Sequence, residues 1–220
     1  MKNNSTGRSR LIAFAKLIKK GAGASDSSRK NPDDLFEGDD ALFKSIAAKS
    51  VTYFEYGCGA STVWMAKNSG ANIHATDTSS AWLDKVRQRV PAEATDRLHL
   101  NHIDLGPLKA WGRPSTYDHR ARFSDYASQM WSQGNADPDV VLVDGRFRVC
   151  CFLTSLRNAR PGTHLFFDDY MNRPHYHVVE EFVQRADTCG RQGLFIVPEK
   201  STLDIERLDA EIAAFRYVMD

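Results

Sequence analysis

Short apolar segments typical of buried strands alternate with segments of helical pattern along most of this chain. Helical connections of this length join parallel strands and pack on both faces of the sheet. The sequence therefore predicts an α/β fold, doubly wound, with a mostly parallel sheet of six or seven strands and helices on both faces. The expected strands are 51–56, 71–76, 97–103, 138–145, 163–170 and 193–198, and the expected helices are 41–50, 61–70, 79–90, 148–162, 175–190 and one from about residue 204.

The chain has 220 residues, of which 42% are hydrophobic, and this suits one domain with a buried core. We expect a single domain over residues 35–220, preceded by a basic arm and linker over residues 1–34. Residues 1–30 hold eight Lys or Arg and one Asp, a net charge of +7, so that the rest of the +1 chain is −6. Residues 8–20 have the pattern of a short basic amphipathic helix, which suits peripheral contact with a membrane or a partner, or packing against the domain.

Neither a membrane span nor a secretory leader is indicated. No run approaches the roughly 18 apolar residues that a span needs, and lysines interrupt the apolar positions near the N-terminus. We therefore expect a cytoplasmic protein, and we expect no nucleic-acid partner. The cysteines lack zinc-ligand spacing, which favours reduced thiols; they are Cys58, Cys150, Cys151 and Cys189.

Acidic side chains stand at the carboxyl ends of five consecutive predicted strands. In a doubly wound sheet this edge is where ligands bind. A single acid at such a place is explained by turn formation or helix capping, whereas five on one edge indicate a binding site. These residues are Glu55, Asp77, Asp104, Asp144 and the pair Asp168 and Asp169.

The first predicted strand runs into a glycine turn, FEYGCGAST, that precedes a helix. Gly57 and Gly59 let a ligand approach the backbone, and the first N–H groups of the helix at Ser61 and Thr62 can bind it. Asp77 stands 20 residues after Gly57, where a carboxylate can accept hydrogen bonds from both ribose hydroxyls. Sites for NAD and for S-adenosylmethionine share these features.

Three details favour S-adenosylmethionine over NAD. Thr62 takes the place of the third glycine in the dinucleotide fingerprint. Glu55 supplies negative charge that suits a cationic ligand and would repel a pyrophosphate. The third predicted strand ends in HIDLG, where Asp104 and a neighbouring N–H suit an adenine ring. An NAD-linked oxidoreductase is therefore the less favoured alternative.

The motifs FEYGCGAST, ATDTSSAWL, HIDLG and VLVDGR, taken in order, resemble those of the class I S-adenosylmethionine-dependent methyltransferases. More narrowly, residues 40–200 look like a bacterial group of methyltransferase-like proteins without an assigned substrate, which is distantly similar to plant glucuronoxylan methyltransferases. The resemblance implies a Rossmann-like methyltransferase fold with S-adenosylmethionine as cofactor. It also implies the contacts of the cofactor: Glu55, Gly57 and Gly59 for the methionine part, Asp77 for the ribose, and Asp104 and Leu105 for the adenine.

Methyl transfer to a hydroxyl requires an aligned acceptor that loses its proton. Asp144 is placed to act as that base, or to orient the acceptor. Asp168 and Asp169 end the next strand, so that the three carboxylates could converge on a divalent cation, which would lower the pKa of the acceptor hydroxyl. In the alternative interpretation, Asp168 or Asp169 caps the turn, and Asp144 binds the charged end of the cofactor.

Residues for the acceptor are expected on both sides of this edge. The guanidinium groups of Arg146 and Arg148 suit a carboxylate or phosphate, or a salt bridge to the acidic edge. The irregular stretch 104–138 is longer than a usual connection, which is typical of a lid or binding loop. Its aromatic residues suit a glycan or anchor the loop to the core, and two histidines at the edge suit proton transfer or a surface role. The further candidates are Trp111, Tyr117, His175 and His177.

The hypothesis that accounts for most of these features is an S-adenosylmethionine-dependent O-methyltransferase. Its acceptor would be a hydroxyl on a carbohydrate or another small polar molecule. The alternative is a non-catalytic protein that binds S-adenosylmethionine and acts through a partner, with the basic arm as its docking segment.

Overall fold

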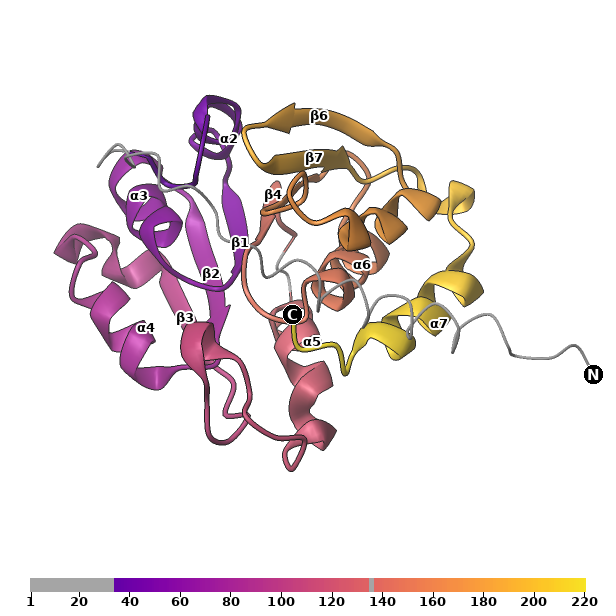
Figure 1. Cartoon of the computed structure of the whole chain (residues 1–220). Helices are drawn as coiled ribbons and strands as arrows, with labels where there is room; N and C mark the ends of the chain where they lie inside the picture. The colour runs from indigo at the N-terminus through magenta and orange to yellow at the C-terminus, as the bar shows by residue number, and fades with distance from the viewer. Residues whose placement is uncertain (1–33, 135–136) are drawn as a thin grey trace, which may run out of the picture.

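The computed structural model describes residues 34–134 and 137–220, and the basic arm predicted over residues 1–34 lies almost wholly outside them. The described residues form a seven-stranded sheet in the order β3-β2-β1-β4-β5-β7-β6 (Figure 1). β1 to β5 are parallel, and β7 runs antiparallel to both β5 and β6. The strands are β1 Thr52–Tyr56, β2 Asn72–Asp77, β3 Leu98–His102, β4 Val140–Val143, β5 His164–Phe167, β6 Arg185–Cys189 and β7 Gln192–Ile196.

Helices cover both faces of the sheet, as predicted. One face packs against α2 Ala41–Ala47, α3 Ala60–Asn68 and α4 Ser80–Arg87. The other packs against α5 Phe123–Ser132, α6 Arg148–Asn158 and α7 Ile205–Phe215. The 3-10 helices are η1 Ala92–Arg97, η2 Ala110–Gly112, η3 Arg120–Arg122, η4 Pro174–Glu181 and η5 Lys200–Thr202.

The central strands are buried on both faces, which explains why their sequences are nearly continuous apolar runs. All four residues of β4 are buried. Val141 and Val143 face the core formed with α5, α6 and α7, and Val140 and Leu142 face the core formed with α2 and α3. The first residues after β1, β4 and β5 lie at one level, because Asp144 donates its N–H to Tyr56 and Asp168 donates its N–H to Val143. The strand ends therefore share one edge, as the sequence predicts.

Two segments differ from the sequence-based expectation. The stretch 104–138 contains α5, whose buried residues Phe123, Tyr126, Ala127 and Met130 recur at helical spacing. The helix expected over 175–190 is wrong beyond its first part, because η4 ends at Glu181 and β6 follows. β6 is an edge strand with four exposed residues, and pairing with β7 stabilises it in place of an apolar pattern.

Within the described residues, no helix is both long and apolar enough to cross a membrane.

Candidate functional site

The glycine turn after β1 packs tightly against the turn that follows β4. Gly57 has a φ of +86°, and a Cβ atom there would lie 2.6 Å from the Cα of Gly145. Its N–H donates to the carbonyl of Thr76 on β2 at 2.8 Å. Glycine is therefore required at position 57 by the conformation and by the neighbouring backbone.

Gly59 has a different environment. Its backbone is extended, and a Cβ atom built on it would meet no atom within 4 Å. The residue stands at the amino end of α3, where N–H groups face outward. This open space is what the predicted adenosyl ligand needs, and of the two glycines only Gly59 faces it.

Glu55 lies beneath the turn. Its side chain is fully buried, and Ser61 donates a hydrogen bond to Oε1 while Thr62 donates one to Oε2 at 2.6 Å. Burial raises the pKa of Glu55 to about 7, although the hydroxyl groups of Ser61 and Thr62 oppose the shift. The geometry makes Glu55 a residue that positions the start of α3. Its predicted contact with the positive end of a cofactor would act through these hydroxyls.

Asp77 ends β2 beside the glycine turn. Its Oδ1 accepts the N–H of Ser79 at 2.9 Å, and the thiol of Cys58 is 3.8 Å from Oδ2. Trp82 donates its indole N–H to the Cys58 carbonyl at 2.7 Å, which fixes the turn next to Asp77. Burial raises the pKa of Asp77. Asp77 and the backbone at Gly59 thus frame one side of the predicted cofactor site.

Asp104 and Leu105 follow β3, the edge strand on the β2 side of the sheet. The Asp104 carboxylate accepts the N–H of Gly106 at 3.0 Å, and this hydrogen bond lowers its pKa. The Leu105 side chain belongs to the core, so only its backbone can reach a ligand. Both residues remain predicted adenine contacts.

A short hairpin over residues 107–115 follows and reaches back to the end of β2. Leu108 pairs with Pro114, and Thr78 donates its hydroxyl to the Gly112 carbonyl at 2.7 Å. Trp111, at the hairpin tip, is 89% exposed and has a φ of 62°. These contacts place Trp111 on the Asp77 side of the edge. Its predicted contact with an acceptor stays a prediction.

Tyr117 lies against the end of the chain. Its hydroxyl is 3.3 Å from the Tyr217 carbonyl, and its ring packs 5.9 Å from that of Phe123. This contact anchors the loop, and the role of Tyr117 toward an acceptor also stays a prediction.

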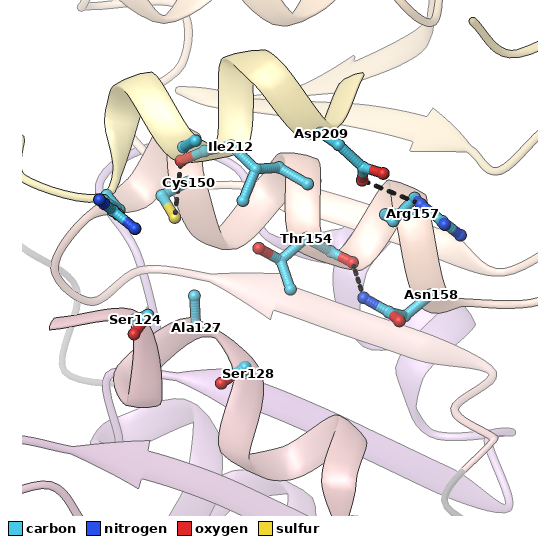
Figure 2. Close-up of a pocket in the computed structure, with 11 residues that line it drawn as sticks. Ser124, Ala127, Ser128, Cys150, Thr154, Arg157, Asn158, Asp209 and Ile212 are labelled. Carbon is cyan, nitrogen blue, oxygen red and sulfur yellow. Dashed lines mark hydrogen bonds and ion pairs between the residues drawn. The ribbon is translucent and has the colours of Figure 1, made fainter. Parts of the chain in front are cut away.

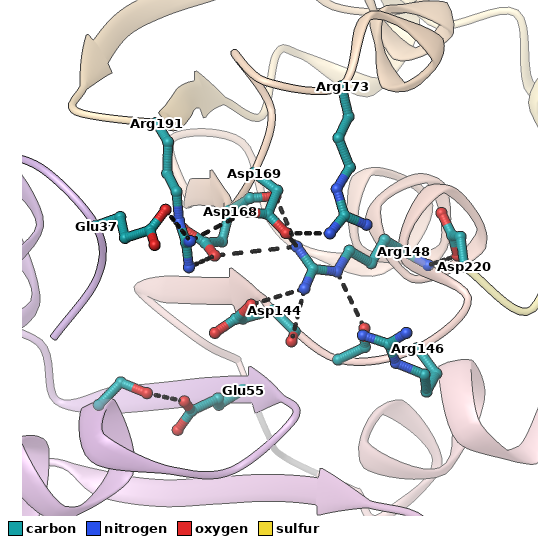
Figure 3. Close-up of polar contacts among 12 residues, drawn as sticks. Glu37, Glu55, Asp144, Arg146, Arg148, Asp168, Asp169, Arg173, Arg191 and Asp220 are labelled. Carbon is teal, nitrogen blue, oxygen red and sulfur yellow. Dashed lines mark hydrogen bonds and ion pairs between the residues drawn. The ribbon is translucent and has the colours of Figure 1, made fainter. Parts of the chain in front are cut away.

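Charged groups gather at the ends of β4 and β5, around the buried guanidinium of Arg148 (Figure 3). Its Nη2 lies 2.9 Å from Asp144 Oδ1, and its Nη1 lies 3.1 Å from Asp169 Oδ2. Nη1 also donates to the Asp168 carbonyl at 2.9 Å. Arg148 is therefore used inside the protein and joins the acidic residues of two strands.

Two further arginines complete this network, and the sequence analysis missed both. Arg191 forms a bidentate pair with Asp168, with distances of 2.6 Å and 3.0 Å, and also reaches Glu37 at 3.3 Å. Arg173 lies 2.7 Å from Asp169. Arg191 and Asp168 are 23 residues apart and meet only through the pairing of β5 with β7. No local sequence pattern signals such a contact.

The arginines occupy the space between the carboxylates, where one of the two interpretations of the sequence places a divalent cation. Asp144, Asp168 and Asp169 are each ion-paired, and no cluster of metal ligands is found within residues 34–134 and 137–220. Burial alone would raise the pKa of Asp169, but the guanidinium groups of Arg148, Arg191 and Arg173 hold it below its usual value. The observed geometry gives the predicted metal site no support.

Among the three aspartates of this network Asp144 is the most accessible, with 27% of its side chain exposed. Its burial and the neighbouring Asp168 raise its pKa well above the usual range, although Arg148 opposes the shift. A carboxylate with a raised pKa holds a proton more strongly, which suits a general base.

The two predicted histidines lie on η4 near this network. His177 Nε2 is 3.2 Å from the Tyr170 carbonyl, and the two rings are 4.6 Å apart. His175 packs against Tyr176, and burial lowers its pKa. Their part in proton transfer stays a prediction.

A hollow of about 410 Å³ lies elsewhere, between α5, α6 and α7 (Figure 2). Thr154 and Asn158 of α6 and Ile212 of α7 line it, and the Cys150 thiol lies 3.7 Å from the Ile212 carbonyl. None of the predicted site residues lines this hollow.

Solved structures share this architecture. A methyltransferase-like protein from Silicibacter pomeroyi DSS-3 is 31% identical, with a TM-score of 0.70 over 80% of this chain and 92% of that chain. Two more distant structures share the fold. A putative O-methyltransferase from Klebsiella pneumoniae is 16% identical, with a TM-score of 0.50 over 90% of this chain and 92% of that chain. A methyltransferase from Geobacter sulfurreducens is 12% identical, with a TM-score of 0.50 over 86% of this chain and 89% of that chain.

No protein-family model and no curated protein matches the chain. The identity to the Silicibacter protein nevertheless extends over most of both chains, and the strand order and the turn after β1 agree with the motifs of the sequence. The chain therefore belongs to the class I S-adenosylmethionine-dependent methyltransferases.

Proposed function

We propose that this chain methylates a hydroxyl oxygen on a carbohydrate or another small polar acceptor, with Asp144 as the general base. The observation that carries the proposal is the Asp144 carboxylate, which Arg148 holds at the end of β4, next to the glycine turn. Bound S-adenosylmethionine would supply an electrophilic methyl group. The residues of the chain would bind and align the reactants and take up the acceptor proton.

The cofactor half of the edge comprises the ends of β1, β2 and β3. The backbone at Gly59 faces open space, and Asp77 presents a carboxylate to a ribose. Glu55 would support this site indirectly, because the hydrogen bonds that it accepts from Ser61 and Thr62 hold the amino end of α3 in place. These residues fit an adenosyl ligand with a short charged tail. Asp104 and Leu105 would contact its adenine.

The acceptor half comprises the ends of β4 and β5. Arg148 donates to one oxygen of Asp144 at 2.9 Å, which holds the carboxylate at the end of β4. The raised pKa of Asp144 makes it a stronger base for a hydroxyl proton. Arg173, on the loop after β5, is partly exposed, and it offers a charged donor to an acceptor with several hydroxyl or acidic groups.

The test separates cofactor binding from transfer. Asp144→Asn should bind S-adenosylhomocysteine with the affinity of the wild type, measured by calorimetry. The reason is that residue 144 follows β4, whereas the proposed cofactor site lies at the ends of β1, β2 and β3. Formation of S-adenosylhomocysteine in the presence of a panel of glycans and small polyhydroxyl compounds should fall by roughly 10²- to 10⁴-fold. Asp209→Asn, which changes an exposed acid paired with Arg157, is the matched control.

Two outcomes would refute the proposal. Equal turnover in Asp144→Asn and the wild type would remove Asp144 as the base. Transfer by the wild type only to nitrogen or sulfur acceptors would exclude O-methylation.

A further inference from the structure

The amino end of α6 is capped by a residue distant in the sequence. Its N-cap position is Phe147, a buried residue with a φ of 55° whose side chain cannot accept a hydrogen bond. The first N–H of the helix, at Arg148, instead donates to Oδ1 of Asp220 at 3.0 Å, across 72 residues of sequence. A carboxylate therefore sits where the helix dipole favours a negative charge.

Asp220 is held more deeply than an ordinary capping residue. It is only 9% exposed, and its second oxygen, Oδ2, is buried without a hydrogen-bond partner. A buried carboxylate oxygen that accepts nothing is costly, so Asp220 is an imperfect partner for the helix end, and its displacement would remove this cost. In Figure 1 the end of the chain, marked C, lies beside α5.

Arg146 adds a second cation to this place. Within residues 34–134 and 137–220 its guanidinium takes part in no ion pair, and its Nε is buried without a partner. Burial and the neighbouring Arg148 lower the pKa of Arg146, while the charge of Asp220 opposes this shift. Figure 3 shows Arg146 and Asp220 on the same side of Arg148. A cation that makes no direct ion pair, next to a helix amino end, favours the binding of an anion.

We propose that the amino end of α6 and Arg146 form a binding site for an oxyanion, and that the Asp220 side chain closes this site until an anion displaces it. The ligand is a carboxylate, phosphate or sulfate group, carried by the acceptor or free in solution. The site adjoins Asp144, so its use in catalysis rests on the proposed function, whereas its affinity for an anion does not.

The probe is inorganic phosphate, titrated by calorimetry into the full chain without cofactor. Asp220→Asn keeps an oxygen for the N–H of Arg148 but removes the competing charge. The variant should therefore bind phosphate about tenfold more tightly than the wild type, which corresponds to the strength of one charge at a partly buried helix end. Adding Arg146→Met to Asp220→Asn should abolish this gain.

Asp204→Asn is the matched control, because Asp204 caps α7 through the N–H of Arg207 at the same distance of 3.0 Å but is exposed. It should leave phosphate affinity unchanged. Affinity for S-adenosylhomocysteine checks that each variant is folded, and Asp220→Ser replaces Asp220→Asn if the latter is not. Equal phosphate affinity in the wild type and the Asp220 variant, or a gain that persists in the double variant, would overturn the proposal.

Turnover distinguishes the source of the anion once the site is established. If the acceptor carries the anionic group, phosphate should inhibit competitively against the acceptor. If the site serves a free ion, phosphate should change the rate without such competition. Failure of methyl transfer in every variant would count against the proposed function and leave the phosphate titration as an independent result.

Discussion

Replacing Glu55 by glutamine should stabilise the protein at alkaline pH and have little effect in acid. Glu55 is fully buried, and burial raises its pKa from 4.5 to about 7. The folded protein therefore binds this proton more strongly than the unfolded chain does. The contribution of protonated Glu55 to the free energy of unfolding is complete below about pH 4.5 and is lost as the pH rises through about 7. Glutamine carries no proton to lose.

The size of the effect follows from these two pKa values. Between pH 5 and pH 8 the wild type should lose about 2.5 kcal/mol of unfolding free energy through Glu55 alone. Glutamine can accept from one of the hydroxyls of Ser61 and Thr62 and donate to the other, because hydroxyl groups rotate. Near pH 5 the variant should therefore lie within about 1 kcal/mol of the wild type. At pH 8 it should be the more stable protein.

The assay is urea unfolding of both proteins at pH 5, 6, 7 and 8. Thermal melts should show the same trend, with the difference in Tm changing by roughly 5–10 °C over this range for a domain of this size. Glu206→Gln, an exposed acid in the first turn of α7, controls for the removal of one negative charge. Parallel loss of stability by the wild type and Glu55→Gln between pH 5 and pH 8 would refute the reasoning.

Three further predictions concern the glycine turn and the arginine network. Gly57→Ala should destabilise the protein by more than about 2 kcal/mol in urea unfolding, because its Cβ would lie 2.6 Å from the Cα of Gly145 at a φ of +86°. Gly59→Ala should change stability by less than about 1 kcal/mol, because its Cβ meets no protein atom within 4 Å. The same Cβ would occupy the space predicted for the ligand, so S-adenosylhomocysteine binding should weaken at least tenfold in calorimetry. Unchanged affinity would place the ligand elsewhere. Arg148→Met should cost about 3–5 kcal/mol at pH 7, because Asp144 would lose its ion-pair partner and Asp169 would lose one of its three. This deficit should shrink as the pH falls below 3.8, the ordinary pKa of an aspartate, because the ion pairs that depress the pKa of Asp169 are lost only when that carboxylate is protonated. A deficit independent of pH would contradict the electrostatic explanation.

The sequence predicted the central parallel strands well because β1, β4 and β5 are buried on both faces. β1, β4 and β5 lie within their expected ranges, since a strand between two helical layers leaves a continuous apolar signal. β3 also lies within its expected range, and β2 ends one residue beyond its own. β6 leaves no such signal. Its residues are exposed, and only its pairing with β7 makes it a strand. α5 was hidden because glycines and prolines before it indicated an irregular loop, although its apolar spacing is helical.

The candidate site was predictable only to the extent that it follows the strand ends. The carboxylates could be placed on one edge because parallel strands end together. Their partners could not, because Arg173 and Arg191 come from a loop and an antiparallel strand whose positions depend on tertiary pairing. The same limit applies to Asp220, which reaches α6 from 72 residues away. Sequence patterns place a charged residue at the end of a strand or helix. Contacts with residues distant in the sequence decide which partner that charge has.

The arginine network also decides which acid can meet an acceptor. Asp168 is fully buried and bidentate with Arg191, and Asp169 is held between three guanidinium groups. Neither has an exposed oxygen edge comparable to that of Asp144, of which 27% of the side chain reaches solvent. In the proposed function Asp168 and Asp169 would therefore act through the arginines, by holding Arg148 and with it Asp144. Under the proposed function, the acidic edge would therefore present one carboxylate to the acceptor, and the other two would hold that carboxylate in place.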